Sequence, residues 1–176
     1  GLFTSKNKAI SNFIALGGDN IDRHIVRKLL SPQMLKQSGP AIDFTTKELD
    51  DVIVPRMQQS AENMKIQFCK YTSNKCAGGD ISQFANQAFQ VSGKSIHKFK
   101  IRGCELRLDS PMISLKEFAD VMSPFVDPSS ANTGVGGWQF GVTSVFDPLD
   151  NAVRKANISP EELNMVLFIG GSSLNP

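Results

Sequence analysis

The sequence has few of the residues that build covalent or metal-centred chemistry. Only three of its 176 residues are cysteine and only two are histidine. Cys69 and Cys76 lack the spacing of a zinc-ligand pair, and the chain has no Ser-His-Asp spacing, nucleophile elbow or Walker loop. We therefore expect Cys69, Cys76 and Cys104 to be free buried thiols in a reducing compartment such as the cytoplasm. We interpret His24 and His97 as structural or surface residues.

An excess of charge and long hydrophobic runs are also absent. The net charge of +2 is too small to indicate a nucleic acid or an anionic membrane as a partner. No apolar run approaches the length of a membrane span, and no secretory signal opens the chain. A length of 176 residues with 40% hydrophobic content is enough for one domain with a sizeable core.

The end of the chain carries its most informative motif. An apolar run from Met165 to Ile169 stops at Gly170-Gly171-Ser172-Ser173, which is typical of a buried strand followed by a loop of bare backbone. Two glycines let N–H groups approach a ligand closely, and two hydroxyls add donors, as in a cradle for a phosphate or the sugar of a nucleotide. A tight turn without a ligand is the alternative. Because the chain stops at Pro176 and starts at Gly1, we expect a piece of a larger protein, whose targeting segment is not observable.

The first half of the chain alternates apolar segments with helix signals. One or two strands are predicted within residues 2–16, followed by Gly17-Gly18 and by a helix with Asp19 as its N-cap, which Pro32 and Gly39-Pro40 break. A capping box at 45–48 opens the clearest helix, which we expect to end near Tyr71. Pro55 makes this either two helices, with Pro55 in the first turn of the second, or one kinked helix.

The second half switches to a period of two before it returns to helices. Short strands are predicted within 81–110, with a turn at Arg102-Gly103, and a second capping box at 114–117 opens a helix to about Met122. Residues 127–138 form a loop by composition. A helix follows from about 142 to 156, and residues 159–162 cap a short helical turn. The sum predicts an α+β fold with a small antiparallel sheet packed on helices.

Three motifs in order resemble a known family. They begin at Leu16-Gly17-Gly18-Asp19-Asn20-Ile21-Asp22, at Ala61-Glu62-x-x-Lys65 and at Ile158-Ser159, and the last runs to Gly170-Gly171-Ser172-Ser173. Their order and spacing are similar to those of the ATPase domain of the 70-kilodalton heat-shock chaperone (DnaK-type) family. The resemblance covers nearly the whole chain and implies the C-terminal half of an actin-like nucleotide-binding domain from a stress-response chaperone. Approximately 1–22 and 157–176 would belong to the base of lobe two, and approximately 23–156 to its lid subdomain.

The resemblance also implies site residues and partners. Glu62 would bond ribose hydroxyls, Lys65 would lie along the nucleoside or reach its phosphates, and Gly170, Gly171 and Ser172 would line the base pocket. A carboxylate suits a vicinal diol, and an ammonium suits an anion. The implied cofactor is ATP or ADP, with Mg in the parent protein but no Mg ligand in this chain. The implied partners are the rest of the ATPase domain and a nucleotide-exchange factor.

Three positions depart from the family pattern. Ile66 and Leu174 stand where the family places arginines that sandwich the adenine, and Cys69 stands at the position of its adenosine-contacting serine. Apolar stacking on adenine can survive this change, but the cation–π contribution cannot. No catalyst of phosphoryl transfer is expected in this chain. The alternatives are a catalytically silent relative whose lid docks other proteins, and an unrelated small α/β enzyme with two Gly-Gly phosphate loops.

Overall fold

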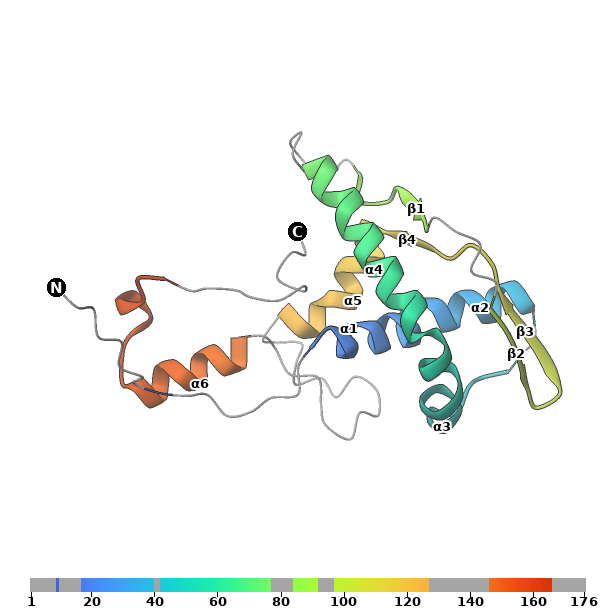
Figure 1. Cartoon of the computed structure of the whole chain (residues 1–176), viewed down its shortest axis with the longest axis horizontal. Coiled ribbons are helices and arrows are strands. Elements are labelled where there is room, and N and C mark those ends of the chain that lie inside the picture. The colour runs from blue at the N-terminus through green and yellow to red at the C-terminus, as the bar shows by residue number, and fades with distance from the viewer. Residues whose placement is uncertain are drawn as a thin grey trace. The chain divides into compact units, whose positions relative to one another are not determined.

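The structure is a computed structural model that describes Ala9 and residues 17–39, 42–76, 84–91, 97–126 and 146–165. Its contacts divide the chain into a larger unit, Gly17–Met122 with Gly171–Pro176, and a smaller unit, Gly1–Leu16 with Ser123–Gly170. Helices and two small antiparallel sheets make up the described parts, which confirms the expected α+β class (Figure 1). The strands predicted within 2–16 and after Met165, and the loop predicted at 127–138, lie outside the described residues.

The first helical run of the larger unit is longer than the sequence predicts. It consists of α1 (Gly18–Ile25), a π-helical turn η1 (Val26–Leu30) and α2 (Ser31–Ser38). The N-cap is Gly17, not Asp19, because the Asn20 side chain accepts a hydrogen bond from the Gly17 N–H at 3.1 Å. The break expected at Pro32 is also wrong, whereas the run does end at Gly39, whose φ of +74° suits glycine.

Prolines follow π-helical turns in both long helical runs. The second run consists of α3 (Thr46–Glu48), η2 (Leu49–Ile53) and α4 (Val54–Cys76), so that Pro55 lies in the first turn of α4. A proline lacks an N–H, and its ring crowds the carbonyl of the previous turn. The wider π turn gives that ring room, and the helical path therefore continues through Pro32 and Pro55.

Helix α4 extends beyond the end expected at Tyr71. The hydroxyl of Thr72 donates to the carbonyl oxygens of Phe68 and Cys69, both at 3.0 Å, and is thereby satisfied inside the helix. Ser73 and Asn74, which follow the expected end, are helical. Residues that favour turns also form helices where their polar groups find partners within the helix.

Two antiparallel strand pairs account for the described sheet structure. Strand β1 (Ala88–Gln90) pairs with β4 (Met112–Ser114), and β2 (His97–Ile101) pairs with β3 (Cys104–Leu108). The predicted turn between β2 and β3 is present: Arg102 and Gly103 both have positive φ, as a two-residue hairpin loop requires. Alternate residues of β3 are buried and exposed, as its sequence pattern predicts.

Three side chains of α2 bind the backbone of the neighbouring strand region like an additional strand. Gln33 donates to the Met112 carbonyl at 2.6 Å and accepts from the Met112 N–H at 3.1 Å. Gln37 makes the same reciprocal pair with Asp109, at 3.0 and 2.7 Å, and the Ser38 hydroxyl does so with Arg107. Helix α2 thus covers backbone groups that an edge strand leaves unpaired.

The core of the larger unit lies between α1, η1, α4 and the strands. Phe68 of α4 is 5.0 Å, between ring centroids, from Phe118 of α5 (Leu115–Val126), and Tyr71 stacks on Phe89 at 4.7 Å. Helix α5 opens with the predicted capping box but continues past Met122 to Val126. Other buried members of this core are Ile21, Ile25, Val26, Leu29, Leu30, Met34, Ile53, Val54, Met57, Ala61, Met64, Val91, Phe99, Ile101, Leu106, Leu108, Ile113 and Val121.

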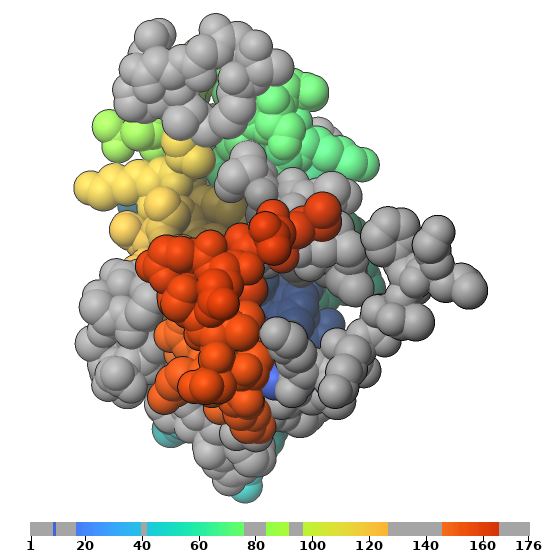
Figure 2. All heavy atoms as spheres, turned by 90° about the vertical axis from the view of Figure 1, so that its left-hand side faces the viewer, coloured from blue at the N-terminus to red at the C-terminus, as the bar shows by residue number. Residues whose placement is uncertain are grey.

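In the smaller unit, α6 (Phe146–Ala156) and the 3₁₀ turn η4 (Pro160–Glu162) form the segment drawn orange to red in Figure 2. Both elements match the prediction, and Pro148 fits because the first turn of a helix needs no N–H donor there. The η4 turn has its capping box, in which the Ser159 N–H donates to the Glu162 carboxylate at 2.7 Å. Among the described residues, no helix combines the length and apolarity that a membrane crossing requires.

Candidate functional site

Four of the site residues that the resemblance implies lie on one face of α4. Glu62, Lys65, Ile66 and Cys69 are separated by steps of three and four residues, which align side chains along a helix. Lys65 and Cys69 are buried, Glu62 is half-buried and Ile66 is exposed. The other four positions, Gly170, Gly171, Ser172 and Leu174, lie outside the described residues.

Lys65 connects this face to the start of α1. Its ammonium lies 2.7 Å from Oδ1 of Asp22 and donates to the Gly18 carbonyl oxygen at 3.4 Å. The side chains of Lys65 and Asp22 are 9% and 3% exposed, so the ion pair is nearly closed to water. Two of the three quoted motifs, 47 residues apart at Gly18 and Lys65, are therefore brought together.

Carboxylates outnumber the ammonium at this place. Burial raises the pKa of Asp22, and the hydrogen bond from Lys65 and its charge oppose that rise. The charges of Glu62 and Asp19 raise the pKa of Asp22 further, so two other carboxyl groups act electrostatically on the partner of Lys65. The local field therefore favours cations and hydroxyl groups over a polyphosphate.

Glu62 is a half-buried polar group on the α4 side of the site. Its Oε2 accepts a hydrogen bond from Gln59 Nε2 at 2.7 Å, one turn earlier on α4. A carboxylate can accept about four hydrogen bonds, so that one such bond leaves capacity for further donors. Glu62 is therefore equipped to receive a pair of hydroxyl groups.

Ile66 and Cys69 give the same face an apolar character. The Ile66 side chain is among the exposed large hydrophobic residues, with 43% of its surface accessible. Burial raises the pKa of the Cys69 thiol to about 11, and the nearby Lys65 charge only partly opposes this. Cys69 is therefore a neutral thiol at physiological pH, and the expectation that it is buried and not in a disulfide is confirmed. Cys104 is free but only half-buried.

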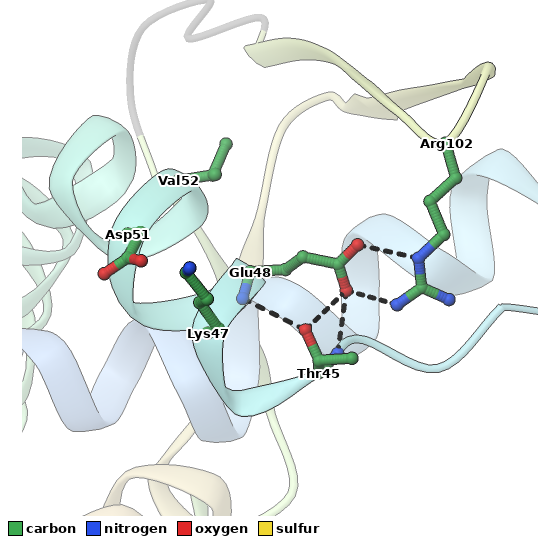
Figure 3. Close-up of a pocket in the computed structure, with 6 residues that line it drawn as sticks. All are labelled: Thr45, Lys47, Glu48, Asp51, Val52 and Arg102. Carbon is green, nitrogen blue, oxygen red and sulfur yellow. Dashed lines mark hydrogen bonds and ion pairs between the residues drawn. The ribbon is translucent and has the colours of Figure 1, made fainter.

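A second polar site, which our sequence analysis missed, surrounds the capping box of α3. A cavity of about 420 Å³ is lined by Thr45, Lys47, Glu48, Asp51, Val52 and Arg102 (Figure 3). Thr45 and Glu48 form the predicted box, with the Thr45 N–H donating to Oε2 at 2.9 Å. Arg102, from the β2–β3 turn, donates to Oε1 of the same carboxylate at 2.7 Å and also pairs with Oε2.

The charges of this cavity are matched within it. The Arg102 guanidinium lowers the pKa of Glu48 to about 2, and the hydrogen bonds from Thr45 act in the same direction. The two cations and two carboxylates among the lining residues give a net charge of zero. No local sequence signal connects Arg102 with Glu48, because the two residues are 54 positions apart.

The two histidines have structural surroundings, as expected. His97 Nε2 lies 2.7 Å from the hydroxyl oxygen of Ser60, and burial lowers the pKa of the ring. Burial also lowers the pKa of His24 to about 4, so this buried ring is neutral at physiological pH. Among the described residues, no group of three or more His, Cys, Asp or Glu side chains is arranged to hold a metal ion.

Comparisons with protein families, with curated proteins and with solved structures found no match to this chain.

Proposed function

We propose that this chain is part of the second lobe of an actin-like nucleotide-binding domain from an ATPase of the 70-kilodalton heat-shock chaperone type. In this proposal α4 and the start of α1 contribute contacts to the nucleoside of ATP or ADP and take part in closing the cleft. The contact of Lys65 with Asp22 and Gly18 supports it most, because it joins the two described motifs of the resemblance at one place.

The chemistry of the α4 face agrees with a nucleoside ligand. Glu62 offers acceptors for the two ribose hydroxyls, and Ile66, one helical turn further, offers an exposed apolar surface to a flat base. Cys69 continues this face with a neutral side chain. Along α4, the polar contact at Glu62 is thus followed by the apolar contact at Ile66, in the same order as the ribose and the base of a nucleoside.

Nucleotide titration followed by backbone amide NMR tests the proposal. Half of a cleft supplies only part of the contacts, so we expect adenosine and ATP to bind in the millimolar range, about 4 kcal/mol. The shifted amides should cluster on α4 around Glu62 and Ile66. Glu62→Ala should abolish the shifts, whereas Glu105→Ala, which removes an exposed carboxylate from β3, should not. We expect no ATP hydrolysis by this chain alone.

The exposed Ile66 favours one alternative, a silent relative whose α4 face docks another protein. An Ile66→Arg variant separates the two functions, because a side chain with 43% exposure can be replaced at little cost to folding. A guanidinium on an adenine face gains about 0.5–2 kcal/mol, or a factor of roughly 2 to 30 in affinity. Tighter adenosine binding at an unchanged melting temperature supports the nucleotide site. If adenosine binds detectably to neither the wild type nor Ile66→Arg, the result supports a face that docks another protein.

A further inference from the structure

We infer that Asp22 sets the selectivity of this site, because it neutralises Lys65 and so directs the site toward the nucleoside and away from the phosphates. This inference rests on the proposed function and states which part of the nucleotide, the nucleoside or the phosphates, the site binds. Asp22 acts through Lys65 and is therefore a positioning residue. The geometry that carries the inference is the 2.7 Å ion pair between the two side chains, both of which are nearly excluded from water.

The ammonium of Lys65 is already engaged on two sides. Asp22 Oδ1 takes its charge, and the Gly18 carbonyl oxygen takes a further hydrogen bond at 3.4 Å. An ammonium has three N–H donors, and two of them are used here within the protein. The third donor belongs to a side chain that is only 9% exposed, so a phosphate would gain the full ammonium charge only by displacing Asp22. This carboxylate, which is 3% exposed, would then stay behind as a buried, unpaired charge.

The surrounding charges oppose a phosphate as well. Asp19 and Glu62 both act electrostatically on Asp22, the carboxylate that pairs with the ammonium. A nucleoside carries no charge and offers hydroxyl donors, which Glu62 can accept beside the ion pair. The wild-type site should therefore gain little from a triphosphate, in contrast to a site with an unpaired lysine.

The experiment compares the affinities of adenosine, ATP and inorganic triphosphate for the full chain. In the wild type, ATP and adenosine should bind within about threefold of each other, and triphosphate alone should not bind. Asp22→Asn leaves the side-chain shape and frees the ammonium charge, so the ratio of ATP affinity to adenosine affinity should rise at least tenfold and should fall again at high salt. Lys65→Met added to Asp22→Asn should remove that gain.

Glu105→Gln is the matched control, since it removes one exposed carboxylate from β3 without touching Lys65. A purely structural role of Asp22 would weaken both ligands alike and leave the ratio unchanged, which would overturn the inference. The inference would be overturned, while the proposed function stands, if the wild type bound ATP tenfold more tightly than adenosine and Lys65→Met lost this preference. If a folded wild-type chain binds neither ligand, the proposed function fails and the inference with it.

The wild type alone also tests the inference, should Asp22→Asn fail to fold. The ¹⁵Nζ signal of Lys65, assigned by its absence in Lys65→Met, should keep its position when ATP is added, because the ammonium stays with Asp22. A phosphate-dependent shift of this signal, absent with adenosine, would contradict the inference.

Discussion

The reciprocal hydrogen bonds between α2 and the strand region make a quantitative prediction about stability. Gln33 and Gln37 each exchange two bonds with one backbone position, Met112 and Asp109 respectively. A hydrogen bond contributes about 0.5–1.5 kcal/mol net to the free energy of unfolding. The contribution lies toward the lower end of this range where water can replace the bond. Gln37 is exposed and Gln33 is half-buried. We therefore expect Gln37→Ala to cost about 1 kcal/mol and Gln33→Ala about 2 kcal/mol of unfolding free energy.

Urea unfolding followed by circular dichroism measures these costs. Lys36→Ala is the control, because this exposed residue lies on the same helix and its replacement should change stability by no more than about 0.5 kcal/mol. Gln33→Glu keeps the acceptor but loses the donor to the Met112 carbonyl, so it should destabilise at least as much as Gln33→Ala. Hydrogen exchange gives a local measure: the Met112 and Asp109 amides should lose protection in their respective variants. Glutamine variants no less stable than Lys36→Ala would refute the reasoning.

Two further predictions concern pH and helix capping. His24 has a folded-state pKa of about 4 against 6.5 for the free side chain, so the unfolded chain takes up a proton first as the pH falls. Stability should therefore drop between about pH 6.5 and pH 4, by about 3 kcal/mol in all, and His24→Gln should flatten this dependence in urea midpoints. Ser114→Ala removes the acceptor that caps the Glu117 N–H at 3.2 Å and should lower stability by about 1 kcal/mol, while Ser110→Ala, outside any cap, should not.

Capping boxes were the features that the sequence predicted best. The boxes predicted at 45–48 and 114–117, and the capped turn predicted at 159–162, are present with their carboxylates bonded to the backbone N–H three residues earlier. The partners in such a box lie within one helical turn, so the local sequence contains the complete interaction. The β2–β3 turn was predictable for the same reason, because Gly103 supplies a positive φ within the loop itself.

The errors arose where a local rule meets a compensating structure. Pro32 was expected to end a helix, but a π-helical turn before it gives the ring room and the run continues to Ser38. Helix α4 was expected to end near Tyr71, but Thr72 satisfies its hydroxyl on the preceding carbonyls. In both cases a local arrangement, of the backbone or of a side-chain hydrogen bond, compensates for a residue that disfavours a helix.

Long-range polar contacts were beyond any local pattern. Arg102 and Glu48, and Gln33 and Met112, are far apart in the chain, and nothing in either segment marks its partner. The candidate site is an intermediate case. Helical spacing alone put Glu62 and Lys65 on one face, but only the packing of α1 on α4 reveals the ion pair of Lys65 with Asp22.

The buried pair of Asp22 and Lys65 is better explained by specificity than by stability. Removing two charges from water costs several kcal/mol per ion, and their attraction repays this only at close range with further hydrogen bonds. The 2.7 Å contact and the bond to the Gly18 carbonyl meet that condition. Apolar side chains of similar volume would pack α1 on α4 at no greater cost. The ion pair adds a directional contact, which favours the register in which Lys65 lies beside Asp22 and Gly18 at the start of α1.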